Sequence, residues 1–292
     1  MCKVAILLAT YNPGPYIHEQ IASIASQTFK DFKIYWGDDG SDEYQLLTIR
    51  KLLEPFVFEE FHFKRVGSTG NFLELLKQSQ EEFIAFCDQD DVWLKDKLAL
   101  QISALEDLKL IPSLTHSPVQ ILHDGHLDRV VDNCQDHSIS KLMGENCCRG
   151  CTMMINKSAK MQILRVNSEF VTWHDWWAIS VMSSIGHIHK SELPLVHYRI
   201  HSKNAVGIPN FSRRGLNYFR REKGLVLSQF RLIHNEFQLE FQATTLEDYM
   251  KFFCLFKFKY YKRVIKLLLD EKRRKSTTSD FLRKVAWSLK TP

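Results

Sequence analysis

The stretch EEFIAFCDQDDVW (residues 81–93) carries the clearest structural signal in the chain. Its first part, through Cys87, is an apolar run of the kind found in strands buried on both faces of a sheet. Three acids, Asp88, Asp90 and Asp91, follow directly. In an open α/β sheet, ligands bind at the edge formed by the carboxyl ends of the strands. We therefore expect these acids to lie at a ligand-binding edge.

The spacing of the acids suits a hard divalent cation. Asp88 and Asp90 are two residues apart and can point the same way in an extended chain. Oxygen ligands of this kind suit Mg2+ or Mn2+ bound to a diphosphate, and Asp91 adjoins them as a third candidate metal ligand. The alternative is a solvated acidic turn that caps a helix beginning near Lys95. The bulky apolar neighbours favour the metal site.

Strands alternate with helices through the first hundred residues. The expected strands are 3–9, 32–37, 61–66 and 81–87, and the expected helices are 16–27, 43–53, 71–79 and 95–108. This alternation predicts a parallel sheet flanked by helices. The sequence contains neither G-x-G-x-x-G nor G-x-x-x-x-G-K-[ST], which disfavours dinucleotide and P-loop nucleotide sites.

Polar residues and glycines in the loops after these strands are candidate ligand contacts. Because parallel strands bring their carboxyl ends to one edge, these loops should meet near the acids. The candidates are Thr10, Tyr11, Asn12, Asp39, Gly70 and Asn71.

The second half of the chain adds one more acid. Strands are expected at 114–122 and 150–156, with a polar excursion containing His and Cys between them, and HDWWAISVMSSIG (174–186) is expected to be a helix. Asp175, in its first turn, is read either as a helix cap or as a base. Indole rings beside an acid can stack on a sugar and shield the carboxylate from water, which favours the base. The adjacent indoles are those of Trp173, Trp176 and Trp177.

Histidines and cysteines give weaker signals. His201, in YRIHSKNAVG, is kept as a candidate diphosphate or metal contact. The chain has seven cysteines, of which only Cys148 and Cys151 have C-x2-C spacing, and no second pair follows them. Structural zinc is therefore disfavoured, and reduced, mostly buried thiols are expected.

Length and composition are those of a globular enzyme. At 292 residues, with 45% hydrophobic and 25% charged residues, the chain can bury one large core with an appendage. The N-terminus shows no signal-peptide pattern, and no apolar run approaches the roughly 18 residues of a membrane span. We expect a cytoplasmic protein.

Charge divides the chain into two parts. Residues 208–292 hold 19 Lys and Arg against 8 Asp and Glu, a net charge of +11, which leaves −6 for residues 1–207. The basic part also carries 15 of the 35 aromatic residues, many of them in segment 251–269. This segment is read either as an amphipathic helix on an anionic membrane surface, peripheral to the inner face, or as a helix packed on the core. Nucleic-acid binding is disfavoured because no nucleic-acid motif is present.

Several motifs together resemble family 2 glycosyltransferases, which are inverting enzymes of the GT-A nucleotide-sugar-binding fold. The resemblance covers residues 1–207 and implies a mostly parallel, Rossmann-like sheet flanked by helices, with 208–292 as a helical appendage. The motifs are ATYN (9–12), SQTF (26–29), DDGS (38–41), the D-x-D at 88–90 and the acid-aromatic helix start near 175. Within the family, GNFLELL (70–76), FCDQDDVWLKDKL (86–98), HDWW (174–177) and YRIHSKNAVG (198–207) are similar to the bacterial rhamnosyltransferase-like subgroup of cell-surface polysaccharide synthesis.

The resemblance also implies roles for residues. Thr10, Tyr11 and Asp39 would contact the nucleotide, Asp88 and Asp90 would hold the cation and diphosphate, and Asp175 would be the catalytic base. The Q-x-x-R-W signature of processive members is absent, so addition of a single sugar is expected. The donor would be dTDP-rhamnose or a UDP-hexose. The acceptor would be a glycan or lipid-linked oligosaccharide of O-antigen or capsule synthesis.

Two other classes of function stay open. One is a non-catalytic nucleotide- or glycan-binding module, which would have no need of a base such as Asp175. The other is a metal-dependent nucleotidyltransferase or phosphohydrolase built on the same acids. Products separate these enzymes, because sugar transfer releases a nucleoside diphosphate and nucleotidyl transfer releases pyrophosphate. The oligomeric state is not indicated by the sequence.

Overall fold

The computed structural model describes most of the first two hundred residues. The described residues are 2–132, 134–142, 146–165, 171, 173–201, 228–229, 232–233 and 236–237. The basic region 208–292, with segment 251–269, lies outside them apart from the three short pieces, so its helices and its boundary at residue 207 stay predictions. Among the described residues, no helix has both the length and the apolar character needed to span a bilayer.

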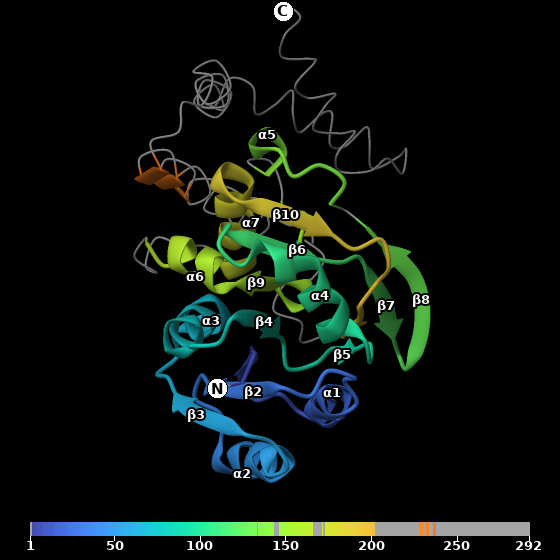
Figure 1. Ribbon diagram of the computed structural model, residues 1–292. Helices are drawn as coiled ribbons and strands as arrows, with labels where there is room; N and C mark the ends of the chain where they lie inside the picture. Colours follow the sequence, from blue (N-terminus) through green and yellow to red (C-terminus); the bar gives the residue numbers. More distant parts are fainter. Residues whose placement is uncertain are drawn as a thin grey trace, which may run out of the picture. The chain divides into compact units, whose positions relative to one another are not determined.

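A seven-stranded mixed sheet forms the centre of the molecule, in the order β10-β6-β9-β4-β1-β2-β3, which Figure 1 shows from β10 at the top to β3 at the bottom. Strands β1 to β4 run parallel where they pair, and β9 is antiparallel to both of its neighbours. The strands are β1 (Val4–Thr10), β2 (Phe32–Asp38), β3 (Phe58–His62), β4 (Phe83–Cys87), β6 (Ser113–His116), β9 (Met154–Asn156) and β10 (His187–Lys190). The predicted α/β class with a mostly parallel sheet is confirmed.

Helices cover both faces of this sheet. Alternate residues of β1, such as Val4 and Ile6, join the buried residues of α1, α2 and α4 in one core cluster. On the opposite face, Phe72 of α3 packs against Phe86 of β4 and His174 of α7. The helices are α1 (Tyr16–Ala25), α2 (Glu43–Leu53), α3 (Gly67–Gln78), α4 (Lys97–Leu105), α5 (Ile139–Leu142), α6 (Lys157–Ile163) and α7 (His174–Ile185), with short 3-10 turns η1 (Glu106–Leu108) and η2 (Gly150–Thr152).

A second sheet connects the acidic loop to residues just before position 201. Its order is β5-β11-β7-β8, with β5 (Val92–Trp93), β7 (Val119–His123), β8 (His126–Val131) and β11 (Val196–Ile200). Strand β5 begins directly after Asp91 and pairs antiparallel with β11. Residues more than a hundred positions apart in sequence therefore lie next to each other at the acids.

Some expected elements differ from those observed. The third strand, expected at 61–66, lies at Phe58–His62, and the helix expected to begin at residue 71 begins at Gly67. The strand expected at 114–122 is divided into β6 and β7 around Ser117 and Pro118, because the two halves join different sheets.

Two cysteines are not free thiols in the structure. Cys134 and Cys147 form a disulfide, so the expectation of reduced thiols is wrong for this pair. Cys87, Cys148 and Cys151 are buried and free, as expected, and Cys2 is partly exposed and free.

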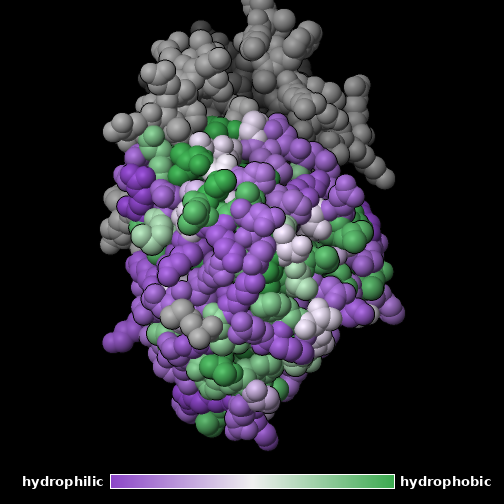
Figure 2. Space-filling view, viewed as in Figure 1, coloured by the Kyte–Doolittle hydropathy of each residue, from purple (hydrophilic) through white to green (hydrophobic). Residues whose placement is uncertain are grey.

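Hydrophobic residues on the face seen in Figure 2 lie in separate groups among hydrophilic ones, which is ordinary for a protein surface.

Candidate active site

Asp38, the last residue of β2, holds together the loops after β1 and β2. Its Oδ1 accepts hydrogen bonds from Thr10 Oγ1 at 2.9 Å and Ser41 Oγ at 2.6 Å. Its Oδ2 accepts from the backbone N–H groups of Gly40 at 2.9 Å and Ser41 at 2.7 Å. Trp36 Nε1 donates to Thr10 Oγ1 at 2.9 Å. Thr10 is thus a buried support of this edge, and its contact with a nucleotide stays a prediction.

Tyr11 and Asn12 lie at the surface of the same edge. The Tyr11 side chain is 46% exposed, which leaves its ring accessible for stacking on a base. The backbone N–H of Tyr11 donates to Gln89 Oε1 at 2.8 Å, which joins the β1 loop to the acidic loop. Asn12 has a φ of 40°, and its backbone N–H donates to Ser41 Oγ at 2.8 Å. The structure therefore brings Tyr11 next to the acidic loop and Asn12 next to Ser41 in the loop after β2.

Asp39 anchors the start of α3. Its Oδ1 accepts from the backbone N–H of Val66 at 2.6 Å, and its Oδ2 from that of Gly67 at 2.8 Å. A carboxylate against free amides at a helix N-terminus stabilises the helix. Both oxygens of Asp39 are used in this way, and its contact with a base or ribose stays a prediction.

Gly70 and Asn71 belong to the body of α3. A Cβ at position 70 would lie 2.8 Å from Val66 Cβ, so Gly70 permits a close turn. Asn71 is 1% exposed, and its Nδ2 donates to the carbonyl of Gly37 at 2.9 Å. A Cβ on Gly37 would come within 2.1 Å of Asn71 Oδ1. We assign Asn71 to the packing of α3 against β2, because its buried side chain leaves little room for contact with a nucleotide.

The acids after β4 form a compact negative cluster. A carboxylate oxygen of Asp88, one of Asp91 and the sulfur of Cys151 lie within 4.8 Å of one another. Burial, followed by the charges of Asp91, Asp90 and Asp175, raises the pKa of Asp88 well above its ordinary value. Burial and the charge of Asp90 raise the pKa of Asp91 to about 7. Carboxylates gathered in this way repel one another unless a cation or a proton is shared among them.

Strand β11 fixes the outer part of the acidic loop. Asp90 Oδ2 lies 2.8 Å from His201 Nε2, so the structure brings His201 into the candidate site. The backbone N–H of Arg199 donates to Asp91 Oδ1 at 2.9 Å, and Arg199 Nε donates to the carbonyl of Asp90 at 2.8 Å. The guanidinium also pairs with Glu19 at 2.8 Å. Arg199 of β11 therefore holds the Asp91 carboxylate and the Asp90 carbonyl, whereas the Asp90 carboxylate faces an imidazole.

Asp175 approaches the cluster from another element. It lies in the first turn of α7, where its Oδ1 accepts from the N–H of Trp176 at 2.7 Å. Its Oδ2 accepts from the N–H of Gly150, at the start of η2, at 3.2 Å. The charge of Asp175 contributes to the raised pKa of Asp88. The second contact crosses between elements, so Asp175 is more than a cap of its own helix.

The three tryptophans near Asp175 have different surroundings. Trp177 is fully buried and donates from Nε1 to the carbonyl of Ile163 at 3.0 Å, so the expectation that it stacks on a sugar is wrong. Trp176 is partly exposed and donates to the carbonyl of Leu142 at 2.7 Å. Trp173 is also partly exposed. Of the three indole rings that the sequence predicts to stack on a sugar, those of Trp173 and Trp176 stay candidates.

Arg149 is a site residue that no sequence motif predicts. Its guanidinium lies 4.9 Å from the ring centroid of Tyr198, and its positive charge opposes the rise in the pKa of Asp91. A single arginine in a cysteine-rich loop has no motif of its own, and only long-range pairing brings it to the acids. The sequence signal for Arg149 is its position next to Gly150, immediately before the expected strand 150–156 that follows the polar excursion.

The donor set fits a hard divalent cation. Asp88 and Asp90 offer carboxylate oxygens at the open end of the loop, which is the ligand type that Mg2+ and Mn2+ take. The raised pKa of Asp88 has neighbouring carboxylates among its causes, and a divalent cation would offset that repulsion. Carboxylate oxygens of Asp88 and Asp91 lie close enough to share one ion, whereas the Asp90 carboxylate faces His201, so the assignment of Asp88, Asp90 and Asp91 as metal ligands stays a prediction.

The chain matches a known family. Residues 5–164 match the sequence model of Glycosyl transferase family 2. The dTDP-rhamnosyl transferase RfbG of Shigella flexneri is 27% identical over 237 residues, which are 74% of this chain and 81% of that protein. The Escherichia coli UDP-Glc:alpha-D-GlcNAc-diphosphoundecaprenol beta-1,3-glucosyltransferase WfgD is 29% identical over 152 residues, which are 52% of this chain and 59% of that protein.

A solved structure supports the fold independently of sequence. The S. aureus TarS fragment 1–349, in complex with UDP-GlcNAc, superposes with a TM-score of 0.62. The identity is 14%, and the alignment covers 92% of this chain and 77% of that one. At this identity the likeness speaks for the fold alone, and it agrees with the predicted GT-A fold.

Proposed function

The chain belongs to glycosyl transferase family 2, and from that membership we propose that it transfers one sugar from a nucleoside-diphosphate sugar to an acceptor hydroxyl, with inversion at the anomeric carbon. The acceptor class is a glycan or a lipid-linked oligosaccharide in surface polysaccharide synthesis. The observation that carries the proposal is the meeting of Asp175 with the acidic loop. Asp175 comes from α7 and Asp88 from the end of β4, and they are close enough that the charge of one raises the pKa of the other.

The donor would bind along the edge after β1, β2 and β4. The exposed ring of Tyr11 would stack on the base, with Asn12 beside it. The diphosphate would lie towards Asp88 and Asp90, with His201 as a further contact. Asp88 and Asp90 would hold Mg2+ or Mn2+, whose positive charge, when bound, stabilises a leaving nucleoside diphosphate.

Asp175 would act as the general base. The acceptor hydroxyl gives its proton to the Asp175 carboxylate while its oxygen forms a bond to the anomeric carbon. The bond from that carbon to the diphosphate breaks, and its electron pair leaves with the nucleoside diphosphate. One displacement inverts the configuration. The hydrogen bond from Gly150 would keep the carboxylate oriented during this step.

The names of two relatives supply candidate substrates. The name of the Shigella relative gives dTDP-rhamnose as its donor, and that of the E. coli relative gives UDP-glucose and a diphosphoundecaprenol-linked acceptor. We propose these two donor classes, and an acceptor of the same lipid-linked kind, for this chain. A protein using such an acceptor would work in the cytoplasm, at the inner face of the membrane.

A donor screen tests the proposal directly. Purified protein is incubated with a panel of dTDP- and UDP-sugars, Mg2+ or Mn2+ and an acceptor, and the release of nucleoside diphosphate is followed. Turnover should require the metal and should be lost in EDTA and in Asp88→Asn/Asp90→Asn. Release of pyrophosphate instead would establish the nucleotidyltransferase alternative. Donor binding without turnover, across acceptors of both classes, would favour the binding module.

A further inference from the structure

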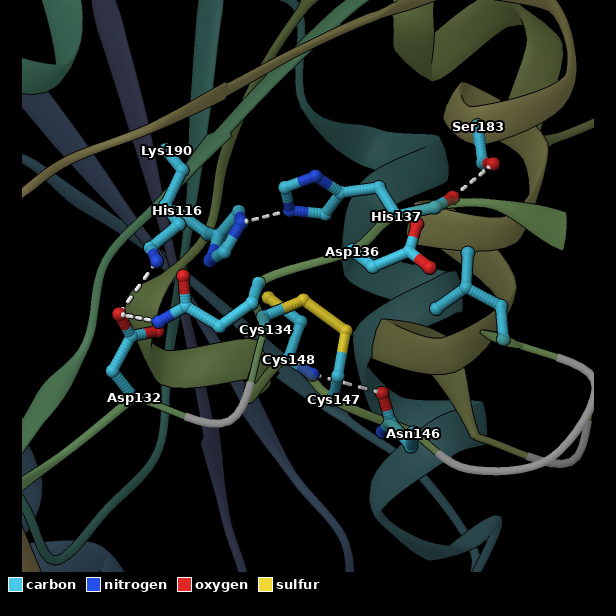
Figure 3. Close-up of a disulfide and its surroundings, with 12 residues drawn as sticks. His116, Asp132, Cys134, Asp136, His137, Asn146, Cys147, Cys148, Ser183 and Lys190 are labelled. Atoms are coloured by element: carbon cyan, nitrogen blue, oxygen red, sulfur yellow. Dashed lines mark hydrogen bonds and ion pairs between the residues drawn. A yellow bond between two sulfur atoms is a disulfide. The ribbon is translucent and has the colours of Figure 1, made fainter. Parts of the chain in front are cut away.

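Four metal-ligating side chains meet in a second cluster, outside the acidic site. His116 ends β6, Cys134 and His137 lie in the segment after β8, and Cys147 lies before η2. One ligand atom each of His116, Cys134 and His137 lie within 4.8 Å of one another, and Cys147 is bonded to the sulfur of Cys134. Figure 3 shows the two imidazole rings beside the pair of sulfur atoms. We propose that, when the cysteines are reduced, these four residues form a structural zinc site.

The ligand types match those of tetrahedral zinc. Two thiolates and two imidazoles are a common set in structural sites, and Cys134 and His137 have the short C-x2-H spacing that lets one loop supply two ligands. The Nε2 atoms of His116 and His137 are 2.8 Å apart. Zinc bonds of about 2.0 to 2.1 Å would place these nitrogens about 3.4 Å apart, so a shift of about 0.6 Å accommodates the ion.

The surroundings favour neutral imidazoles and a closed site. His116, Cys134 and Cys147 are 1%, 2% and 6% exposed. Burial, the neighbouring His137 and Lys190 together lower the pKa of His116 to about 3, so the ring is in its metal-binding form at neutral pH. The two thiolates would balance the charge of the zinc. The ion pair of Asp132 and Lys190 lies beside His116, where a carboxylate commonly supports a ligating histidine.

The free cysteines nearby do not belong to this cluster. Cys148 and Cys151, whose C-x2-C spacing is the only zinc-like cysteine pair in the sequence, point elsewhere. The Cys151 sulfur lies with Asp88 and Asp91, and the Cys148 sulfur lies 3.8 Å from Thr152 Oγ1. The proposed cysteine ligands are therefore Cys134 and Cys147, which are 13 residues apart and do not have C-x2-C spacing.

The site would connect the excursion between β8 and η2 to the central sheet. Cys147 is three residues before Gly150, whose N–H donates to Asp175. His137 is further tied to α7, because Ser183 Oγ donates to its carbonyl oxygen. A bound ion would thus hold the segment that carries Arg149 and orients Asp175. This consequence rests on the proposed function, but the metal site itself does not.

The two states of the cysteine pair are related by a balanced step. A dithiol reductant transfers two electrons to the bond between Cys134 and Cys147 and leaves as its cyclic disulfide. The cysteines become thiols, and each releases a proton to the solvent when its sulfur binds zinc.

Metal analysis of the intact protein tests the site. Protein reduced with a dithiol and loaded with zinc should retain about one zinc per chain through gel filtration in excess Mg2+, and oxidised protein should retain much less. Replacement by Co2+ should give the visible bands of a tetrahedral site together with thiolate charge-transfer absorption. These measurements use the wild type and hold even where a variant fails to fold.

Variants locate the ion. Cys134→Ser and His137→Gln should lose the bound zinc and change the cobalt spectrum, whereas Cys148→Ser and Cys151→Ser, the matched controls, should keep both. Cys151→Ser also separates this site from the acidic one, because Cys151 lies against Asp88 and Asp91. Reduced wild type without retained zinc, cobalt spectra without thiolate bands, or loss of these bands in Cys151→Ser but not in Cys134→Ser would overturn the proposal.

Discussion

Asp175 is the residue on which the proposed chemistry depends most. A carboxylate in the first turn of a helix is often only a cap, and the bond to the N–H of Trp176 is of that local kind. The bond to Gly150 is not, because it joins α7 to the segment before β9. A base needs such orientation from outside its own helix.

Asp175→Asn should lower kcat by about two orders of magnitude or more while the Kd for the donor stays nearly unchanged. The amide keeps the shape and one acceptor oxygen, but it cannot take a proton. Turnover is measured by release of nucleoside diphosphate, and donor binding by calorimetry. Asp96→Asn, at the N-cap of α4, is the matched control, because it neutralises an acid at another helix start. Equal loss of donor affinity and turnover would instead assign Asp175 a role in helix capping alone.

Lys97 gives a test of electrostatics in the core. It is fully buried in α4, its Nζ lies 4.1 Å from the Trp93 ring centroid, and it donates to Gln101 Oε1 at 2.6 Å. Burial lowers its pKa from 10.5 to about 8. Between these two values the unfolded chain binds more protons than the folded chain, so the cost of burying Lys97 falls as the pH rises.

The free energy of unfolding of the wild type, relative to Lys97→Met, should therefore rise by about 1 kcal/mol from pH 7 to pH 9. The difference between the two proteins removes the contributions of the other titrating groups. Denaturant unfolding at both pH values measures it, with Lys95→Met, at an exposed position, as control. If the difference in the free energy of unfolding between the wild type and Lys97→Met were constant with pH, Lys97 would titrate alike in the folded and unfolded chains.

Site residues that belong to a local sequence pattern are predicted by the sequence, whereas those that meet only through contacts between distant segments are not. Asp88, Asp90 and Asp175 follow from local patterns, namely an apolar run ending in acids and an acid at a helix start. Arg149 carries no local pattern, because it meets the acids only after β9 inserts antiparallel into the sheet. The pairing of Cys134 with Cys147 is equally hidden, since nothing in the spacing of seven cysteines selects it.

At the scale of elements, the start of α3 depends on a single side chain. The N-cap residue of α3, Val66, makes no capping bond with its side chain, and Gly67 has a φ of 75°, a region that favours glycine. Asp39 supplies the missing acceptors from the loop after β2. This explains why the observed helix begins four residues before the expected residue 71, because apolar periodicity does not register a cap contributed from a distant loop.

Asp39→Ala should lower the free energy of unfolding by about 1 to 2 kcal/mol in the absence of nucleotide, because it leaves the amides of Val66 and Gly67 unsatisfied. Thermal or denaturant unfolding measures the change. Asp42→Ala, which removes the cap that Asp42 gives to Gln45 N–H in α2, should cost about 1 kcal/mol and serves as the reference. Unchanged stability together with lost donor binding would assign Asp39 to the nucleotide alone.

Apolar sequence patterns predict some strands and helices and do not predict others. The first two strands and helices are predicted by the sequence because β1 and β2 are buried, largely apolar runs and the buried residues of α1 and α2 recur at helical spacing. The sequence does not predict strand β8, because its six residues, from His126 to Val131, are almost all exposed and carry no apolar alternation. Strand β9 was placed too early, because the GCT of the expected strand forms the turn η2.

At the scale of the whole molecule, charge is the property that divides the chain. The described pieces show that residues beyond 207 still pack with the first part, since Ile233 is fully buried and Glu236 pairs with Arg165 at 2.9 Å. A truncation after Leu239, the last residue of the first compact unit, preserves these contacts. Residues 240–292 then hold 13 Lys and Arg against 6 Asp and Glu, a net charge of +7.

The intact chain should bind liposomes that contain anionic lipid, and a chain truncated after Leu239 should not. Each basic residue near an anionic surface contributes about 1 kcal/mol, and the aromatic residues of segment 251–269 would add shallow burial. Because screening weakens the electrostatic part, binding should fall steeply as the salt rises from about 0.05 to 0.5 M. Co-sedimentation with anionic and neutral liposomes measures it, and replacement of Lys262, Arg263 and Lys266 by Gln, which keeps the length of the region, is the matched variant. Equal sedimentation of the intact and truncated chains, or binding that ignores lipid charge, would instead assign the region to packing on the core, and a lipid-linked acceptor would then have to be reached without it.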